Sequence, residues 1–372
     1  YFKFLDLINW KGPSFIFLDE VTGIEGWAKV LKFLIDRGQF KRSVVVISGS
    51  NAVDLKRGAD RLPGRRGSGR EIAFLPLSFK EYLAVAHPNL YHQVEKKLSH
   101  PFRLKLSFLE KNSRELYLNL KSLNRYLENY LLCGGFPRLI NEFHRDSLIP
   151  YKTYEDYLGW IRGEIAKQKR EEKKGLQILA ELSVTLSSKL GWDAIAKKIG
   201  GLSHHTVEDY INISELLFIG KTLYQIDLSR KRINWRKNKK FYFIDNLVYF
   251  LARGIAEKWS NYFKQSVEVL SLPKTKSQLL EQVVFNHLIR TSTNWLEPNV
   301  VFWSNSSEID FILWEEKCLL PIEVKWQRKV GKNDFLPMVN LKFKKGIVLS
   351  QTALERYQDF LILPASIFLS MI

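Results

Sequence analysis

The amino-acid sequence predicts an α/β protein of several domains. Short runs of β-branched and aromatic residues alternate with amphipathic helical segments near both ends of the chain, which is typical of sheets covered by helices. The stretch between these two regions is mostly helical. With 372 residues, the chain is long enough for about two to four domains.

Residues 15–85 form the first predicted α/β unit. Ser78 and Glu81 have the spacing of a capping box, which predicts that a helix begins there. The predicted strands are residues 15–18, 44–47 and 71–74, and the predicted helices are residues 26–37 and a segment that opens at residues 76–82. This order is typical of a parallel sheet with helical crossovers.

The first predicted strand ends in two adjacent carboxylates, Asp19 and Glu20. A buried parallel strand delivers such acids to the carboxyl edge of a sheet, where ligands bind. In nucleotide hydrolases the first acid helps to hold Mg²⁺ and the second orients the attacking water. The next strand ends in Ser48-Gly49-Ser50, so a hydroxyl of Ser48 or Ser50 is expected near the γ-phosphate. The alternative is a surface turn at the end of a strand.

Together with further motifs, this pattern resembles a family of archaeal and bacterial AAA+ ATPases. The resemblance covers essentially the whole chain. It implies a P-loop ATPase core, a helical lid, a winged-helix-like region and a nuclease-like C-terminal domain, with ATP and Mg²⁺ as cofactors. The further motifs are Gly26-Trp27, Leu62-Pro63-Gly64-Arg65, Leu75-Pro76-Leu77-Ser78-Phe79-Lys80-Glu81-Tyr82 and Gly134-Gly135-Phe136-Pro137.

The same resemblance assigns roles to single residues. It implies that Gly135 and Pro137 lie near the nucleotide base, and that Arg65 supplies positive charge to a phosphate of a neighbouring site in a homo-oligomer. No G-x-x-x-x-G-K-[ST] loop occurs in the chain, although that loop cradles the phosphates in such enzymes. ATP binding by these residues is therefore expected only if the loop lies upstream, and the start at Tyr1 predicts the back part of a longer or trimmed protein.

Four domains are predicted along the chain. Within the third, the sequence predicts a long charged helix at residues 151–174 and a shorter one at residues 176–190. The predicted domains are the back part of the AAA+ core at 1–86, the helical lid at 87–150, a helical, winged-helix-like domain at 151–270 and a nuclease-like domain at 271–372.

The third domain contains a predicted helix–turn–helix at residues 192–217. Its second helix begins with His204 and His205, a polar start suited to contact with a nucleic-acid groove or phosphate. Residues 221–225 and 241–244 form a predicted hairpin with a basic tip that is expected to contact DNA phosphates as a wing. The tip includes Arg230, Lys231, Arg232, Arg236 and Lys237, and continues to Lys239 and Lys240. The alternatives are a packing or oligomerisation module and a solvated hairpin.

The fourth domain carries a second set of acids. Glu323 and Lys325 are two apart on a predicted strand and share a face, and a hairpin brings Asp310 beside them. Glu281 lies on the preceding helix. This pattern resembles the PD-(D/E)xK nuclease superfamily, in which carboxylates such as Asp310 and Glu323 hold Mg²⁺ and a lysine stabilises the phosphate. The alternatives are a solvated sheet edge and a nuclease-like fold without cleavage activity.

The composition points to a polyanionic partner. A formal net charge of +18 favours DNA, RNA or a membrane surface as partner, and the alternative is a generally basic proteome or solubility alone. Nucleic acid, and DNA first, is the prediction, because no basic amphipathic helix with an apolar face indicates a membrane surface. The two cysteines, Cys133 and Cys318, have no metal-binding spacing, and a reducing cytoplasm is the expected location. The apolar tail at residues 360–372 is predicted to be a core strand or an interface segment.

Two hypotheses follow from these patterns. The first is an AAA+-type ATPase coupled to DNA binding, with a Mg²⁺-dependent nuclease-like domain. The second is a nucleotide-switch regulatory or scaffold protein whose nuclease fold is inactive and only binds nucleic acid or a protein partner. Metal binding by Asp310 and Glu323 discriminates between them.

Overall fold

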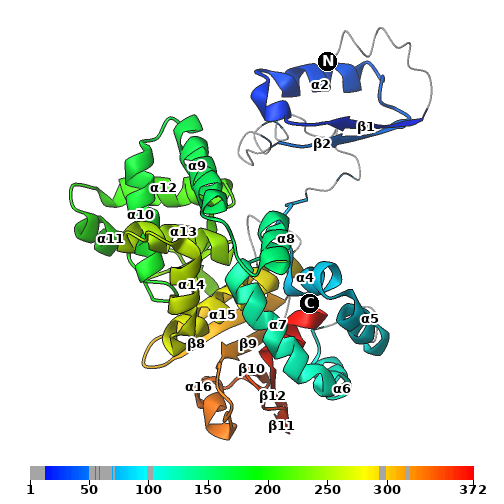
Figure 1. The fold of residues 1–372 in the computed structure, drawn as a ribbon, viewed down its shortest axis with the longest axis vertical. Helices are drawn as coiled ribbons and strands as arrows, with labels where there is room; N and C mark the ends of the chain where they lie inside the picture. Colours follow the sequence, from blue (N-terminus) through cyan, green and yellow to red (C-terminus); the bar gives the residue numbers. More distant parts are fainter. Residues whose placement is uncertain are drawn as a thin grey trace. The chain divides into compact units, whose positions relative to one another are not determined.

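The structure is a computed structural model. It describes residues 13–49, 72–98, 104–292, 299–315 and 318–372, and the single residues Leu55, Gly58 and Gly69. The chain divides into two compact units, Tyr1–Ile72 and Ala73–Ile372. Both are drawn in Figure 1, and each is described here by itself.

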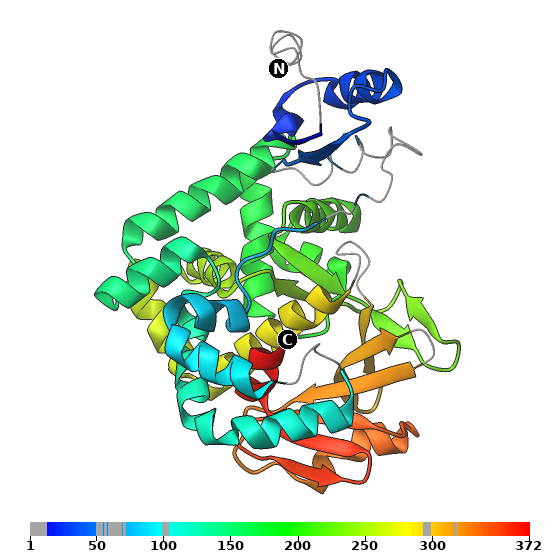
Figure 2. The same ribbon diagram turned by 90° about the vertical axis from the view of Figure 1, so that its right-hand side faces the viewer.

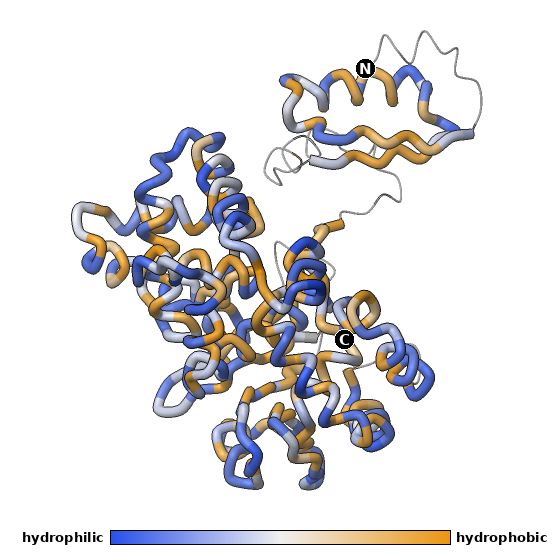
Figure 3. Tube along the Cα trace, in the orientation of Figure 1, coloured by the Kyte–Doolittle hydropathy of each residue, from blue (hydrophilic) through white to orange (hydrophobic). Residues whose placement is uncertain are grey.

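The first unit is a strand–helix–strand arrangement. Strands β1 (Ser14–Leu18) and β2 (Ser43–Ile47) pair in parallel, and helix α2 (Trp27–Asp36) lies between them in the chain after the 3₁₀ turn η1 (Val21–Gly23). One face of the strand pair packs with Leu31 of α2. Both strands are strongly apolar (Figure 3). These two strands and this helix confirm the predicted elements.

The other face of the strand pair is exposed. Its apolar side chains alternate with the buried ones along each strand, as the period of a β-strand requires. They are Phe15, Phe17, Val44 and Val46. The prediction of a third strand at residues 71–74 is wrong for its described part, because residues 72–74 form no strand and Phe74 is 97% exposed. An isolated segment without a pairing partner gains neither hydrogen bonds nor burial as a strand.

The second unit begins with a layer of helices. The predicted capping box is confirmed: the Ser78 hydroxyl accepts from the Glu81 N–H at 3.2 Å, and the Ser78 N–H donates to the Glu81 carboxylate at 2.7 Å. Phe79 and Tyr82 are fully buried. The helices are α4 (Phe79–Ala86), α5 (Pro88–Lys97), α6 (Leu106–Leu116), η2 (Tyr117–Asn119), α7 (Leu120–Cys133) and α8 (Pro137–Asp146). In this structure α4, which was predicted to close the first domain, packs in the second unit.

The predicted long helix at residues 151–174 is wrong, because two helices replace it. Helix α9 (Tyr151–Lys167) ends before Lys169, whose φ is +57°, and α10 (Glu172–Val184) follows. The break lets the two helices pack closely, since a Cβ at Gly175 would lie 2.8 Å from the Ile165 side chain. Charge periodicity alone gave no sign of this contact.

The predicted helix–turn–helix segments are confirmed as helices. Helix α11 (Trp192–Ile199) is followed by Gly200 and Gly201, both with positive φ, and by α12 (His204–Leu216). The hydroxyl of Ser203 caps α12 by accepting from the Thr206 N–H at 3.0 Å. Strands β3 (Gly220–Leu223) and β6 (Lys240–Phe243) then pair antiparallel, as the predicted hairpin requires.

An eight-stranded sheet forms the centre of the C-terminal half. Helix α15 packs on one face, over β8 and β9, and the short helix α16 packs against β8. The strand order is β11-β12-β10-β9-β8-β7-β4-β5. The strands are β4 (Gln225–Asp227), β5 (Arg232–Asn234), β7 (Val300–Ser304), β8 (Glu308–Glu315), β9 (Cys318–Val324), β10 (Gly346–Ser350), β11 (Glu355–Tyr357) and β12 (Phe360–Pro364). The remaining helices are α13 (Asn246–Glu257), α14 (Tyr262–Ser271), α15 (Pro273–Leu288), η3 (Ile289–Thr291), η4 (Lys332–Phe335), α16 (Leu336–Asn340) and α17 (Ala365–Met371).

The tip of the predicted wing is part of this sheet. Strands β4 and β5 lie between β3 and β6 in the chain, and β4 pairs in parallel with β7, with Gln225 opposite Phe302. Figure 2 shows this light-green hairpin beside the orange strands. Backbone pairing between β4 and β7 fixes the base of the tip to the sheet, and the contact of the tip with DNA phosphates stays a prediction. The predicted core strand in the C-terminal tail is confirmed by β12, and α17 continues it.

Candidate functional site

Asp19 and Ser48 lie side by side in the first unit. They directly follow β1 and β2, and these strands are parallel with Leu18 opposite Ile47. The Ser48 N–H donates to the Leu18 carbonyl at 2.9 Å, and the Ser48 hydroxyl donates to the Asp19 carboxylate. Neighbouring parallel strands thus place a carboxylate and a hydroxyl at one sheet edge, where α/β proteins bind ligands.

Glu20 occupies the next position in a left-handed conformation, with φ of +51° and ψ of +38°. Its N–H donates to Asp19 Oδ1 at 3.1 Å and lies 3.4 Å from Ser48 Oγ. Both acids are exposed. Residues with positive φ other than glycine are uncommon and cluster at functional sites. The three predicted residues Asp19, Glu20 and Ser48 are therefore adjacent, while Ser50 and Arg65 lie outside the described residues.

The oxygen donors at this edge fit Mg²⁺. A carboxylate of Asp19 and a hydroxyl of Ser48 are hard ligands, and Mg²⁺ is usually held by one or two carboxylates together with phosphate oxygens and water. The position of Asp19 is thus compatible with its predicted role as a Mg²⁺ ligand, and the place of the Ser48 hydroxyl near the γ-phosphate stays a prediction.

Gly134 and Gly135 belong to a buried junction in the second unit. Gly134 has φ of +69°, and a Cβ there would lie 2.1 Å from Asp245 Oδ1. The Gly135 N–H donates to Asp245 Oδ2 at 2.7 Å, and its carbonyl accepts from the Leu77 N–H at 2.8 Å. Burial raises the pKa of Asp245 to about 6. Pro137 begins α8. The role of Gly135 and Pro137 near a nucleotide base stays a prediction.

The second predicted set of residues also comes together. Asp310 on β8 and Glu323 on β9 face each other across an antiparallel pair. The Asp310 N–H donates to Glu323 Oε2 at 3.3 Å, and the Val324 N–H donates to Asp310 Oδ2 at 2.9 Å. Lys325 Nζ lies 2.9 Å from Glu323 Oε1. Both carboxylates are buried.

Lys240 joins this set, although the sequence had placed it in the basic tip. Its Nζ lies 3.0 Å from Glu281 Oε1, 2.6 Å from Glu308 Oε1 and 3.7 Å from Asp310 Oδ1. The side chain is only 1% exposed. The Tyr242 hydroxyl donates to Glu281 Oε1 at 2.5 Å. Lys240 and Tyr242 are two apart, alternate with Phe241 and Phe243 and share one strand face, and this spacing is the signal that could have identified them.

Burial and charge act against each other in this cluster. Burial raises the pKa of Glu281 to about 7, although Lys240 opposes the shift. Burial and the neighbouring Asp310 raise the pKa of Glu323 to about 8. For Lys240, burial alone would lower the pKa, but Tyr242 and the surrounding carboxylates outweigh it, and the pKa is well above the usual value. The ammonium group therefore stays charged.

The arrangement of this cluster does not fit a divalent cation. Within the described part of the chain, no group of three or more His, Cys, Asp or Glu side chains has a geometry that could hold a metal ion. The Lys240 ammonium lies among the carboxylates instead. Magnesium binding by Asp310 and Glu323 thus gains no support from the donor geometry.

Acidic side chains surround the start of α12, where the sequence predicted nucleic-acid contacts. The His204 imidazole lies 3.3 Å from Asp193 and 3.7 Å from Glu208. Further along the helix, Asp209 pairs with Arg170 at 3.1 Å. His205 is exposed. A phosphate approaching this helix would meet negative charge, so α12 is a poor electrostatic match for DNA.

The basic tip is better placed. Because β4 and β7 are parallel, the turns that follow Asp227 and Ser304 lie at the same end of the sheet. Strand β8 begins at that end with Glu308 and Asp310. The turn after β4 is fixed by Asp227, which accepts the N–H groups of residues 229 and 230. The exposed basic residues of the tip are Arg230, Lys231 and Arg232, and the exposed segment after β5 adds Arg236 and Lys237.

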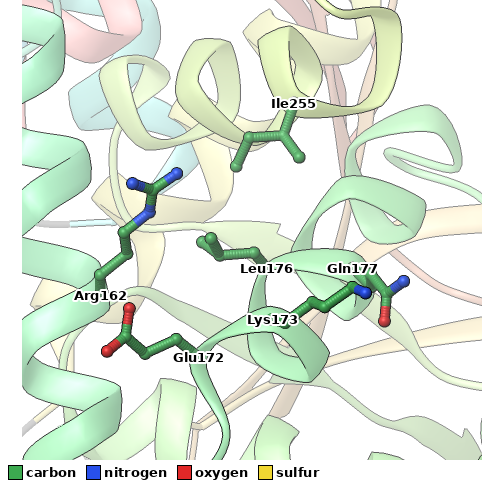
Figure 4. A pocket seen from close by; sticks show the side chains of 6 residues that line it. All are labelled: Arg162, Glu172, Lys173, Leu176, Gln177 and Ile255. Atoms are coloured by element: carbon green, nitrogen blue, oxygen red, sulfur yellow. The ribbon is translucent and has the colours of Figure 1, made fainter.

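A separate open pocket of about 390 Å³ lies among α9, α10 and α13 (Figure 4). Arg162 and Glu172 line it with Lys173, Leu176, Gln177 and Ile255. None of the residues predicted from the sequence lines this pocket. In the described residues, no helix has the length and apolar character needed to cross a membrane.

Comparison with known proteins matches three segments of the chain. Residues 2–83 match an AAA domain, residues 124–258 match a domain of unknown function (DUF8612), and residues 276–368 match a second domain of unknown function (DUF4143). No curated protein and no solved structure matches the chain. The first match indicates a nucleotide-binding ATPase. Glu281, Asp310, Glu323 and Lys325 fall within the third segment, whereas Lys240 falls within the second.

Proposed function

We propose that this chain is an AAA-type ATPase that acts on DNA. The observation that carries the ATPase assignment is the AAA-domain match over residues 2–83, within which Asp19, Glu20 and Ser48 lie together at the ends of β1 and β2. Exposed acids at this edge are accessible to a nucleotide. The assignment thus rests on family and geometry together.

Each of these residues has a distinct role in the proposed reaction. Asp19 and the Ser48 hydroxyl would hold Mg²⁺, which neutralises phosphate charge when bound with ATP. Glu20 orients the attacking water and accepts a proton from it. Arg65 acts on a phosphate across the interface of a homo-oligomer, and Gly135 and Pro137 lie near the base. The proposed location is the cytoplasm.

The proposed DNA contact lies at one end of the eight-stranded sheet. The basic tip and Lys325 are at the same end, and the chain carries a net charge of +18. Arginine and lysine side chains bind phosphate oxygens without reading the bases. We assign the phosphate contact to Arg230, Lys231 and Arg232, with Arg236 and Lys237 beside them, rather than to His204 and His205.

A second candidate function is DNA cleavage. One observation favours it, namely the assembly of Asp310, Glu323 and Lys325 as the nuclease resemblance requires. The position of Lys240 among the carboxylates opposes it, because metal-dependent cleavage needs a bound cation. Binding without cleavage is therefore the interpretation that the geometry supports better.

ATP turnover by the Glu20→Gln variant tests the proposal. We expect the rate to fall about 100-fold or more while nucleotide binding is retained, because a lost general base typically costs that much. Glu25→Gln is a matched control, since Glu25 is also exposed and precedes α2. Binding and turnover are measured separately, with and without a DNA duplex, because the chain contains no G-x-x-x-x-G-K-[ST] loop.

The outcomes separate the parts of the proposal. Equal turnover in Glu20→Gln and the wild-type protein would remove Glu20 from catalysis. An ATPase rate that does not respond to DNA, together with no shift of labelled DNA on a gel, would leave an ATPase without the proposed partner.

A further inference from the structure

Lys240 lies in the space that a cation would occupy within the carboxylate cluster. Its Nζ is 2.6 to 3.7 Å from one oxygen each of Glu281, Glu308 and Asp310, which come from α15 and β8. The same group lies 5.6 Å from the ring centre of Phe302. Carboxylate oxygens from two elements therefore converge on one cation, which is the Lys240 ammonium group and not a metal ion.

The charges of the cluster are nearly balanced by lysines. Four carboxylates, from Glu281, Glu308, Asp310 and Glu323, face three ammonium groups. Lys240 contacts the first three, Lys325 lies 2.9 Å from Glu323, and Lys189 lies 3.2 Å from Glu308. With all four acids ionised, four negative and three positive charges leave a net charge of −1, and the raised pKa values of Glu281 and Glu323 reduce the negative charge further near neutral pH. Little uncompensated negative charge remains to attract a divalent ion.

The backbone around Lys240 holds it in place. Strand β6 pairs with β3, with Lys240 opposite Leu223, and all four residues of β6 are buried. Tyr242, two positions later, donates to the same Glu281 oxygen that Lys240 contacts. The Lys240 side chain is 1% exposed, so its charge is neutralised by the carboxylates around it and not by water. Lys240 is thus a fixed component of the cluster.

The cation and the carboxylates come from different parts of the sequence. Lys240 falls in the segment that matches one domain of unknown function, residues 124–258, and the four acids fall in residues 276–368. The ion pairs therefore join the two matched segments within one compact unit, in addition to balancing charge. The arrangement needs residues of both matched segments.

We propose that Lys240 is the permanent counter-cation of the Glu281–Glu308–Asp310–Glu323 cluster and closes it to divalent metal ions. The C-terminal half then keeps its fold without metal and presents DNA-binding basic groups without metal-dependent cleavage. The closure itself does not depend on ATP hydrolysis or on DNA binding, so its test stands apart from theirs.

Binding of Mn²⁺ to the full chain, followed by electron paramagnetic resonance, tests this inference. We expect Asp310→Asn to bind as much Mn²⁺ as the wild-type protein, because the native cluster holds none. Lys240→Ala opens the cluster, and we expect it to bind about one more Mn²⁺ per chain than the wild type. Its melting temperature without metal should fall by roughly 5–10 °C and rise again with Mn²⁺.

Lys221→Ala is the matched control. Lys221 is also buried, lies on the paired strand β3, and forms an ion pair with Glu215 at 2.9 Å. We expect this variant to lose stability without gaining Mn²⁺ or recovering on its addition.

Two results would overturn the inference. One is a loss of Mn²⁺ binding in Asp310→Asn relative to the wild type, which would show that the native cluster takes metal. The other is a folded Lys240→Ala variant that neither melts earlier nor gains Mn²⁺. If Lys240→Ala does not fold, the Asp310→Asn comparison decides the question.

Discussion

His287 of α15 is buried, and both of its ring nitrogens form hydrogen bonds. Its Nε2 accepts from the Phe79 N–H at 2.8 Å, so Nδ1 carries the proton and donates to the Val283 carbonyl at 2.7 Å. The Tyr130 ring lies 6.2 Å away. Burial, together with the nearby positive charge of Arg290, lowers the pKa of His287 to about 3. The neutral imidazole is therefore part of the folded state.

This residue predicts loss of stability in acid. The unfolded chain binds a proton on His287 near its ordinary pKa of 6.5, whereas the folded chain binds it only near pH 3. The stabilisation is present above pH 6.5 and falls as the pH drops from 6.5 towards 3, by about 1.4 kcal/mol per pH unit. Urea unfolding at pH 7.5 and pH 5 measures it. The pH dependence should weaken in His287→Gln, and an unchanged dependence would exclude His287 as its source.

A local sequence motif determines where helix α4 begins. In the capping box, the backbone N–H groups of Ser78 and Glu81 each donate to the side chain of the other residue. The Phe79 N–H, another group at this helix start, donates to His287. Local and long-range bonds thus meet at one helix terminus.

Ser78→Ala is expected to lower the free energy of unfolding by about 1 kcal/mol, because the helix loses its cap. Thermal unfolding should show a melting temperature lower by about 2–4 °C. Ser188→Ala, a change at an exposed turn position, serves as the control and should leave stability within about 0.5 kcal/mol. Equal melting curves for Ser78→Ala and the wild type would contradict the role of the cap.

The hairpin that begins with β3 and ends with β6 changes its pairing register along its length. Leu223 pairs with Lys240, but Gln225 pairs with Asn234, so the register shifts and the residues between Asn234 and Lys240 leave the ladder. The outer half of the hairpin can therefore join β7. Through this shift the outer part of the hairpin forms one edge of the large sheet.

For the whole molecule, the dominant quantity is the net charge of +18. A protein that neutralises phosphates releases counterions from DNA, so its affinity falls steeply with salt. If the basic tip makes the contact, changing Arg230, Lys231 and Arg232 together to Gln should reduce the slope of log affinity against log salt by about 2–3.

Fluorescence anisotropy with a short DNA duplex over a salt series measures this slope. A triple change of the exposed Lys29, Lys32 and Lys41 to Gln alters the net charge equally in the other compact unit. A larger effect of this control than of the tip variant would show that overall charge, and not the tip, governs binding.

The sequence by itself determined the local elements. The alternation of apolar residues predicted β1, α2 and β2, and glycines with a capping serine predicted the turn between α11 and α12. Asp19 and Ser48 could be paired in advance because both follow adjacent parallel strands. Each of these inferences depends on neighbours in sequence or on one repeated topological rule.

Tertiary structure alone decided the rest. The break after Lys167 accompanies the close packing of Gly175 on Ile165. Residues 72–74 form no strand, and no partner strand pairs with them in the described residues. Lys240 looked like one of many basic residues on a hairpin tip. Its role is set by Glu281, 41 positions away, and by Glu308 and Asp310 beyond it. Charge pairing across such separations depends on which strands meet, and periodicity carries no information about that.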